Sequence, residues 1–424
     1  MKILRLVSIL ALVAIAHGEP LPFRQAVELA VKRSALISAT EQIRAHESYL
    51  AAKRLYIPQV IAGSGLAENY GFPLSIEGSA PAVVSVNATG YLINFGQREI
   101  VRAAHTEWDA TAFSTADRRQ QAILDTAVTY IQLDRMITAL HLLRQQEQEA
   151  AGAGEITAKR VQAGIAPQLE LTRAALATAR VRVTIAQAEG NADVLRNVLS
   201  QLTGVPATRI ETVTESIPQL PDVRRSDNLA EQAASSSPAV KLAFAHADAK
   251  QSNARAEHKQ LLPAVDLVGQ YGLFSSYNNF QHYFLHFQRN NGIIGVAIRV
   301  PLLNLSQRAR AAAADAEAVQ ARREAEEAKN KVSNETRKLQ HEVAQLSASR
   351  EVARLEYQLA RADVDTVQTK VQAGTATLRD EADARLAEGQ KYSAYLNATS
   401  QLEQTQMQLM RSTGDLEKWA LAGQ

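Results

Sequence analysis

The chain has 424 residues, with 46 Lys and Arg against 44 Asp and Glu and a formal net charge of +2. This balance argues against a nucleic-acid-binding protein, which requires a clustered excess of basic side chains. Aromatic residues make up only 5% of the chain, and cysteine is absent. Small side chains suit long helices that pack closely in thin layers. The lack of cysteine excludes disulfides, thiolate metal sites and a lipid anchor on cysteine.

Residues 1–18 resemble an export signal. Two basic residues precede an apolar run over residues 6–16, and Ala16 and Gly18 place small residues where a signal peptidase reads them. The run of about 11 residues is too short for a membrane-spanning helix, which needs about 20. We therefore predict a cleaved signal peptide over 1–18 and an exported mature protein that begins at Glu19 and has no transmembrane helix.

The chain contains two copies of one pattern. Val161-Gln162-Ala163-Gly164 recurs as Val371-Gln372-Ala373-Gly374, an offset of about 210 residues. The same offset relates Asn94, Gln97 and Arg98 to Asn304, Gln307 and Arg308, and Thr203-Gly204 to Thr413-Gly414. Three matches at one offset predict an internal duplication, with a first repeat over 19–204, a linker over 205–227 and a second repeat over 228–424.

Both copies have the same predicted order of elements. A first helix is expected over about 23–56 and again over about 228–261, each ended by a proline. Two strands follow, and then a very long helix. In the second copy this helix begins near Ser306 and meets no helix breaker before Gly374, so it is about 100 Å long. A second helix of about 35 residues returns from each glycine turn.

The apolar stripes of the long helices do not fit a simple coiled coil. In the second copy, one heptad-like stripe slips in phase into another. The first comprises Val332, Leu339, Val343 and Leu346, and the second Val352, Leu355 and Leu359. A two-stranded coiled coil would keep one seam. A helix in the wall of a tube touches a neighbour on each side and needs more than one stripe. An ordinary long helical bundle is the alternative at this point.

Four segments are predicted to be strands: the first is Gly-rich and weakly patterned, and the other three alternate between apolar and polar residues. They lie over about 60–70, 82–95, 265–273 and 292–303. Segments of about ten residues with one apolar and one polar face are typical of transmembrane β-barrels. The segment from Ser275 to Asn291 is rich in aromatic residues, which fits an interfacial girdle or an external loop.

Four strands cannot close a barrel by themselves. The smallest membrane barrels need about eight strands, and an open sheet edge cannot face lipid because its backbone groups would lack partners. We therefore expect several chains to share one barrel. These physical arguments permit either two chains or three.

The duplicated order of helix, proline, strand pair, long helix, glycine turn and return helix resembles the TolC-type outer-membrane efflux channels. The residues that carry the resemblance are Leu21–Ala35, Leu92-Ile93-Asn94-Phe95-Gly96, both Val-Gln-Ala-Gly turns, Pro167 with Leu169–Ala179, and Leu378–Ala387. The resemblance covers the mature chain. It implies a mainly α fold with a small β part: long helical hairpins form a periplasmic tube, and four strands per chain contribute to a shared transmembrane β-barrel.

The same resemblance implies partners and a location. It implies a homotrimer with a twelve-stranded barrel in the bacterial outer membrane, in contact with its lipid. The helices would extend into the periplasm and dock an inner-membrane pump through a periplasmic adaptor. No lipid anchor is expected.

Acidic residues follow each glycine turn. Asp380 and Asp383 are three residues apart and share one helix face, and Glu170 and Arg173 hold these places in the first copy. Taken alone, they indicate a solvated acidic patch. The resemblance implies that Asp380 and Asp383 form the acidic constriction of the periplasmic end.

The turns themselves are the expected adaptor contact. The resemblance implies this role for the tip residues Ala163, Gly164, Glu170, Ala373 and Gly374. The family's gate has a basic residue two places after the second glycine, where this chain has Ala376. Lys370 and Arg379 are therefore the candidates for holding the tip closed.

No residue pattern indicates catalysis. His282 and His286 lie close together at helical spacing, but nothing else nearby supports a metal site. No glycine-rich loop precedes a helix in the way that phosphate binding requires. We therefore predict no enzyme, no metal and no cofactor.

The leading functional prediction is a passive exit duct in the outer membrane, serving an efflux pump or a type I secretion system. The alternative is a periplasmic adaptor, a coiled-coil interaction protein of an envelope complex. Adaptors usually have one hairpin flanked by β-rich domains and a membrane anchor. Two full repeats with paired strands disfavour that alternative. The substrate stays open among drugs, metal ions and secreted proteins.

Overall fold

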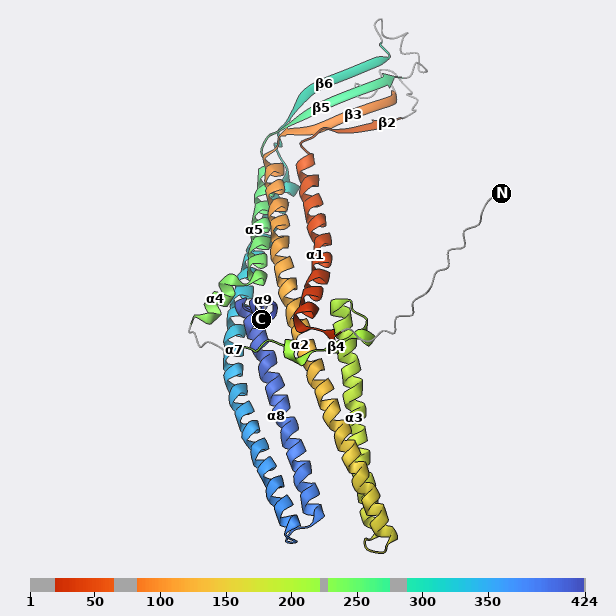
Figure 1. The fold of residues 1–424 in the computed structure, drawn as a ribbon. Coiled ribbons are helices and arrows are strands. Elements are labelled where there is room, and N and C mark those ends of the chain that lie inside the picture. The colour runs from red at the N-terminus through yellow and green to blue at the C-terminus, as the bar shows by residue number, and fades with distance from the viewer. Residues whose placement is uncertain (1–19, 65–81, 222–227, 275–287, 423–424) are drawn as a thin grey trace, which may run out of the picture. The chain divides into compact units, whose positions relative to one another are not determined.

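The computed structural model describes residues 20–64, 82–221, 228–274 and 288–422 (Figure 1). The expected signal peptide over 1–18 lies outside the described residues, as do most of the aromatic-rich segment and both His282 and His286. Among the described helices, none combines the length and the apolar character that crossing a membrane requires.

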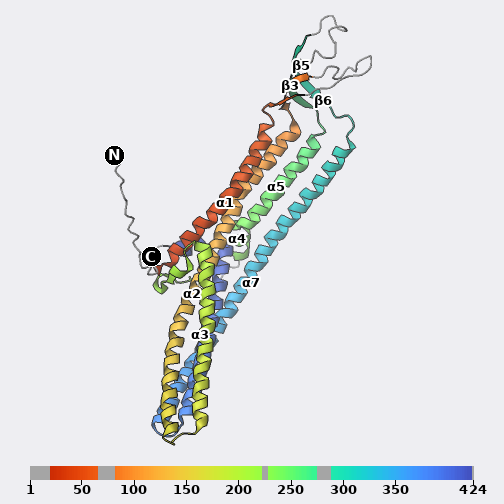
Figure 2. The same ribbon diagram turned by 90° about the vertical axis from the view of Figure 1, so that its right-hand side faces the viewer.

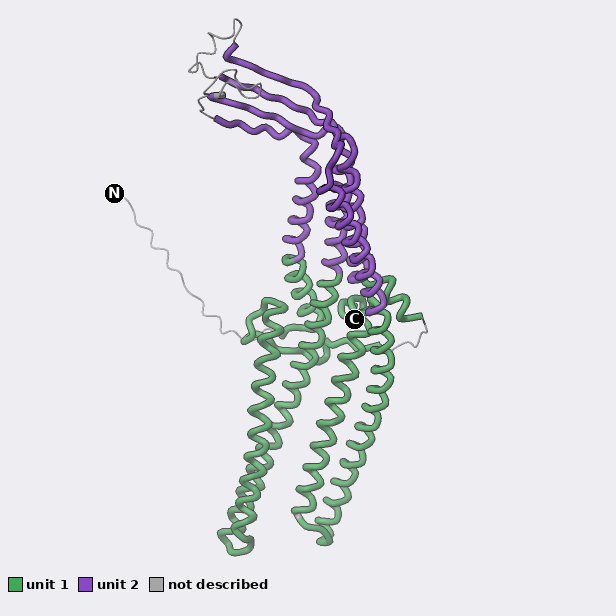
Figure 3. The backbone as a smooth tube through the Cα atoms, turned by 180° about the vertical axis from the view of Figure 1, so that it is seen from behind, with its two compact units in different colours: residues 1–37, 117–237, 332–424 green, residues 38–116, 238–331 purple. Residues whose placement is uncertain are grey.

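The chain divides into two compact units (Figure 3). Unit 1 comprises residues 1–37, 117–237 and 332–424, and unit 2 comprises residues 38–116 and 238–331. Each unit draws on both halves of the sequence. Each compact unit thus contains matching parts of both predicted repeats. The units therefore cut across the repeats, which follow one another along the chain.

Unit 2 contains a four-stranded antiparallel sheet. Its strands are β2 (Gln59–Gly63), β3 (Ala82–Ile93), β5 (Ala264–Phe274) and β6 (Asn290–Arg299), in the order β2-β3-β5-β6. All four predicted strands are present, although residues 65–70 of the first predicted strand lie outside the described residues. The last one ends at Arg299 rather than at Leu303, because Pro301 has no backbone N–H to donate to a ladder.

The sheet has one apolar face and one largely polar face. The register places alternate residues of neighbouring strands on the same side. The apolar face carries Val60, Ala62, Val84, Val86, Ala88, Val265, Leu267, Tyr271, Leu273, Ile294, Val296 and Ile298, together with Asn290, Gly90, Gly269 and Gly292. The polar face carries Gln59, Ser85, Asn87, Thr89, Tyr91, Asp266, Gln270, Asn291 and Arg299, together with Ile61, Ala264, Val268, Phe274, Ile293 and Ala297. This division confirms the alternation predicted from the sequence.

The predicted first helix of the second copy is wrong in one respect. Instead of one helix over 228–261, the structure has α4 (Leu229–Ser236) and α5 (Pro238–Lys259). Ser237 has φ −55° and ψ 123°, outside the helical region. The cause is Pro238, whose ring disfavours a helical conformation at the residue before it. In the first copy Ala35 holds that place, and α1 (Phe23–Arg54) is continuous.

The long helices are α2 (Phe95–Gln162) and α7 (Leu305–Gln372), each of 68 residues. Both begin with the same cap. Asn94 Oδ1 accepts from the Gln97 backbone N–H at 2.9 Å, and Asn304 Oδ1 accepts from the Gln307 N–H at the same distance. Each glutamine side chain then donates to a carbonyl of the preceding helix, Gln97 to Ala52 at 2.7 Å and Gln307 to Glu257 at 2.9 Å. The repeated Asn and Gln therefore tie each long helix to the helix that precedes its strand pair.

Unit 1 contains two helical hairpins, which Figure 2 shows from a second side. α2 turns into α3 (Gln168–Thr203), and α7 turns into α8 (Leu378–Thr413). Both return helices have 36 residues and end at a glycine with φ of 82° (Gly204) or 85° (Gly414), as predicted.

Only one of the two predicted apolar stripes of α7 is covered within the chain. Leu339 and Val343 are buried against Leu402 and Leu409 of α8. Members of the second stripe, such as Leu359, are exposed. The phase slip read from the sequence therefore corresponds to a change of face.

The core of unit 1 joins the start and the end of the chain. The rings of Phe23 on α1 and Tyr130 on α2 meet edge to face at 5.4 Å, and Phe23 meets Trp419 of α9 (Leu416–Leu421) at the same distance. The Tyr130 hydroxyl donates to the Leu21 carbonyl at 2.6 Å and accepts from the Val213 N–H at 2.8 Å. Burial raises the pKa of this phenol.

The described part of the linker is ordered by this core. It forms two short 3-10 helices, Ala207–Arg209 and Thr214–Ser216, and a two-residue strand, β4 (Glu211–Thr212). β4 pairs in parallel with β1 (Pro20–Leu21). This pairing has no signal in the sequence, because two residues give no periodicity to detect.

Candidate functional site: the two hairpin tips

The two hairpin tips share one backbone turn. At the first tip, Ala163 N–H donates to the Lys159 carbonyl at 3.0 Å, and Ile165 N–H donates to the Arg160 carbonyl at 2.9 Å. At the second tip the matching bonds run from Ala373 to Thr369 and from Thr375 to Lys370, at the same two distances. The duplication therefore preserves the hydrogen bonds of the turn and not only its sequence.

The backbone angles at positions 164 and 374 require glycine. Their φ values are 71° and 74°, in the left-handed region that only glycine adopts without cost. A Cβ atom at either position would meet no atom within 4 Å. The turn therefore needs glycine for its conformation, and the space above each glycine is open to a partner.

The two return helices begin differently. The first begins after Pro167, whose side chain makes no capping hydrogen bond. The second begins after Thr377 with a capping box. The Asp380 N–H donates to Thr377 Oγ1 at 3.2 Å, while Asp380 Oδ2 accepts from the Thr377 N–H at 2.8 Å.

The capping box engages one of the two predicted constriction acids. The Thr377 hydroxyl also donates to Asp380 Oδ2, at 2.7 Å. The backbone N–H of Thr377, followed by its hydroxyl, holds the pKa of Asp380 below its ordinary value, because both hydrogen bonds favour the carboxylate. Asp380 therefore stabilises the start of its own helix, a role that the Thr-x-x-Asp spacing could have predicted.

The other predicted acids have separate partners. Asp383 lies 3.7 Å from Arg379, and both side chains are exposed. Glu170 receives a hydrogen bond from Arg173 at 2.8 Å. The structure thus gives Asp380 and Asp383 different neighbours on one exposed helix turn, and Asp383 is the less constrained of the two.

The basic candidates for closing the tip differ in the same way. Arg379 approaches Asp383 of its own helix. For Lys370, the backbone carbonyl accepts from Thr375 and Ala376. Its ammonium forms no ion pair with any residue in the described ranges.

A tyrosine cluster in the second hairpin was not predicted. The ring of Tyr357 on α7 lies 5.0 Å from that of Tyr392 and 6.4 Å from that of Tyr395, both on α8. The positions that match Tyr357 and Tyr392 in the first hairpin are Glu147 and Arg182, which form an ion pair at 2.7 Å. The offset of about 210 residues carried this signal, but only the hairpin register shows that the two positions face each other.

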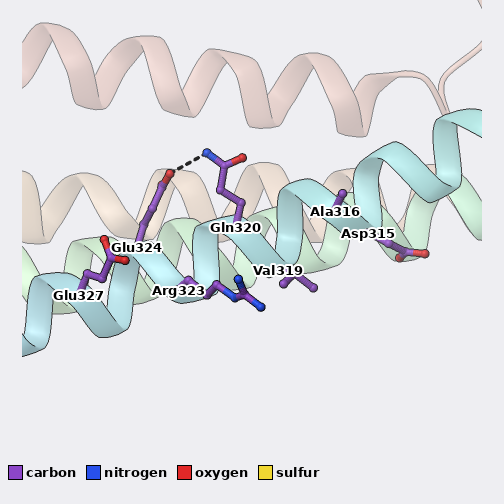
Figure 4. Close-up of a pocket in the computed structure, with 7 residues that line it drawn as sticks. All are labelled: Asp315, Ala316, Val319, Gln320, Arg323, Glu324 and Glu327. Atoms are coloured by element: carbon purple, nitrogen blue, oxygen red, sulfur yellow. Dashed lines mark hydrogen bonds between the residues drawn. The ribbon is translucent and has the colours of Figure 1, made fainter.

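A shallow hollow lies along one side of α7 in unit 2 (Figure 4). Its lining residues are Asp315, Ala316, Val319, Gln320, Arg323, Glu324 and Glu327. Gln320 donates to Glu324 at 2.8 Å. Its lining comes from a single helix and mixes both signs of charge, which indicates a solvated surface. In the ranges that the structure describes, no group of three or more His, Asp or Glu side chains is placed to hold a metal ion.

Comparisons with known proteins agree on the class of fold. A sequence profile described as "Outer membrane efflux protein" matches residues 29–205 and 229–415, which together span most of both predicted repeats. Protein CyaE of Bordetella pertussis is 27% identical over 260 residues, 60% of this chain. The aligned region spans about half, 55%, of that relative's length.

Solved structures of outer-membrane proteins share the fold. VceC of Vibrio cholerae matches with a TM-score of 0.72 at 18% identity, over 92% of this chain and 96% of its own. The CmeC channel of Campylobacter jejuni matches with a TM-score of 0.74 at 14% identity, over 95% and 87%. The open state of the MtrE channel of Neisseria gonorrhoeae gives 0.72 at 14% identity, over 93% and 90%. At these identities the likeness shows a shared fold.

Proposed function

The chain belongs to the outer membrane efflux protein family, and on that basis we propose that it is the outer-membrane exit duct of an efflux or secretion machine. It would pass substrates across the periplasm and the outer membrane without catalysing a reaction. The observation that carries the proposal is the family match over both repeats, each of which supplies two strands of a sheet with one apolar face.

The sheet supports a barrel made by several copies. β2 and β6 are its edges, and each pairs on one side only among the described strands. Unpaired edges cannot face lipid, and four strands are too few to close. We propose that three copies pair β2 of one with β6 of the next to give twelve strands, with the apolar face toward lipid.

The exposed stripe of α7 supports the same assembly. Val352, Leu355 and Leu359 are all more than half exposed in the single chain. In a tube of helices, each long helix would meet a neighbour on both sides. We propose that these residues pack against helices of the adjacent copy, so that the 68 residues of α7, about 100 Å of helix, form part of the wall.

The hairpin tips are the proposed contact with a periplasmic adaptor. Gly164 and Gly374 are exposed, as are Ala163 and Ala373 beside them, and a Cβ atom at either glycine would meet no described atom within 4 Å. A helical hairpin of a partner could approach such a surface closely. Glu170 lies on the exposed first turn of the return helix and would flank this contact.

We also propose a role for the acids near the second tip. In a trimer, Asp380 and Asp383 would each occur three times around the axis, and such rings favour cations. Asp383 would contribute more to this effect, because Asp380 is engaged by Thr377.

The test combines assembly with conduction. Purified protein in detergent should have the mass of a trimer by native mass spectrometry, fractionate with the outer membrane, and form channels in planar bilayers. The Asp383→Asn variant should lose more cation preference than Asp380→Asn. A monomer that forms no channels would contradict the duct. Trimeric channels whose selectivity neither variant changes would contradict only the role of the acids.

A further inference from the structure

Among the described residues of the four sheet strands, only two are charged, and they form an ion pair with each other. They are Asp266 on β5 and Arg299 on β6. Arg299 Nη2 donates to Asp266 Oδ2. The Asp266 side chain is only 18% exposed, whereas that of Arg299 is 63% exposed. The sheet therefore holds the acid and leaves much of the guanidinium open to solvent.

The contact with Arg299 does not satisfy both carboxylate oxygens of Asp266. Its second oxygen, Oδ1, is buried and has no hydrogen-bond partner among the described residues. A buried carboxylate oxygen without a partner is costly, and sheets usually avoid one. The pair is therefore poorly explained as a device for stability alone.

The strand register fixes the side on which the pair lies. Arg299 is opposite Ala264, and Asp266 is opposite Ala297 on one side and Tyr91 on the other. Both charged residues therefore belong to the polar face. Lipid-facing positions of a barrel disfavour charge, and lumen-facing positions tolerate it. In the barrel proposed above, this face can only line the interior.

The strand pair of the first copy, β2 and β3, provides an internal comparison. The positions that match Asp266 and Arg299 there are Ile61 and Thr89, at offsets of about 205 and 210 residues. β2 and β3 form the same antiparallel ladder, with Gln59 opposite Thr89 and Ile61 opposite Asn87. A strand pair can therefore form with no charge at these positions. The pair β5 and β6 thus carries Asp266 and Arg299 for a reason other than strand pairing.

We propose that Asp266 and Arg299 line the water-filled passage and set the charge selectivity of the barrel section, an inference that rests on the proposed duct. The ligands are small ions and the ionised groups of passing substrates. The exposed Arg299 attracts anionic groups, and Asp266 limits that attraction by holding one side of the guanidinium. Three copies would form a ring of three such pairs, and rings of charged side chains are a general means of selecting ions.

The two single variants should shift the permeability ratio in opposite directions. Asp266→Asn leaves Arg299 uncompensated and should shift the permeability ratio toward anions by about threefold, while Arg299→Gln should shift it toward cations by a similar factor. The double variant should return close to the wild type. Thr89→Ser, at the matching position on β3, is the control and should leave the permeability ratio unchanged. The measurement is the reversal potential in planar bilayers under a salt gradient.

A chemical version of the test changes the charge at position 299 only after the channel has folded and inserted. The chain has no cysteine, so Arg299→Cys creates a single reactive thiol that can be modified after the channel has inserted. A cationic methanethiosulfonate should restore the wild-type reversal potential, and an anionic one should move it further toward cations. A neutral reagent of similar size should do neither.

The outcomes separate this inference from the proposed function. If the wild type forms no channels, the duct itself is wrong. If channels form but the thiol at position 299 does not react, the polar face does not line the passage. If it reacts and no variant or reagent moves the reversal potential, Asp266 and Arg299 do not control selectivity.

Discussion

The two hairpin tips have the same backbone turn and different side-chain chemistry. Both use a glycine with φ near 70° and the same backbone hydrogen bonds. Beyond the turn, the first return helix begins after the rigid Pro167, and the second is held by the Thr377 capping box. Further along, an ion pair in the first hairpin takes the place of a tyrosine cluster in the second. The duplication has kept what the backbone requires and has left the side chains free to diverge.

The tyrosine cluster should give the largest difference between the hairpins. Tyr392→Ala removes ring contacts with Tyr357 and should destabilise the second hairpin by about 2 kcal/mol, less than a fully buried aromatic would cost. Arg182→Ala, at the matching position, breaks an exposed ion pair and should cost less than about 1 kcal/mol. Local hydrogen exchange, followed by mass spectrometry, should show the larger loss of protection in the second hairpin. Equal losses would contradict the comparison.

The glycine turns should respond alike. Gly164→Ala and Gly374→Ala each force an alanine into the left-handed region, which costs about 1–2 kcal/mol. Because no atom crowds either position, conformational strain is the only expected source of the cost. Hydrogen exchange at both tips should rise by a similar factor, roughly tenfold. A marked difference between them would show that the two turns are not equivalent.

Removing the cap should affect one tip only. Thr377→Ala deletes the hydroxyl that accepts from the Asp380 N–H and should destabilise the start of α8 by about 1 kcal/mol. Pro167→Ala, at the matching position, removes no side-chain hydrogen bond and should have a smaller effect on α3. Thr377→Ser, which keeps the hydroxyl, is the control and should behave like the wild type.

The smallest expected effect depends on pH. The pKa of Asp380 is lowered by the N–H and hydroxyl of Thr377, so its contribution is complete above the ordinary aspartate value of about 3.9. It is lost as the pH falls through the lowered pKa. A spin label at residue 375 should therefore become more mobile only below about pH 3.9, whereas a label at residue 165 should not. In the Asp380→Asn variant, the label at 375 should show no such transition.

The sequence predicted the parts of the fold that repeat or alternate. The Val-Gln-Ala-Gly turns, the Asn and Gln before each long helix, and the strand alternation each reflect a backbone requirement that leaves a local pattern. The break before Pro238 depends on a single residue that the first copy lacks, so the repeat pattern alone predicts a continuous helix there.

At the hairpin tips the residues could be predicted from the sequence, but their partners could not. Asp380 and Asp383 look equivalent in a helical projection, yet one is held by Thr377 and the other lies near Arg379. The tyrosine cluster depends on which residues of α7 and α8 face each other. The turn sets that register, so it cannot be predicted from the sequence of either helix alone.

The strand order has a consequence for how the protein folds. β3 pairs with β5, so that Val86 lies opposite Tyr271, nearly two hundred residues later in the chain. The helical hairpins instead join segments that follow one another directly. Closing a long loop costs entropy before its contacts form, so local pairs form first. We expect the hairpins to become protected early in refolding and the sheet last, which pulse-labelling hydrogen exchange can resolve. The apolar face would then stay unassembled until the helical hairpins have formed.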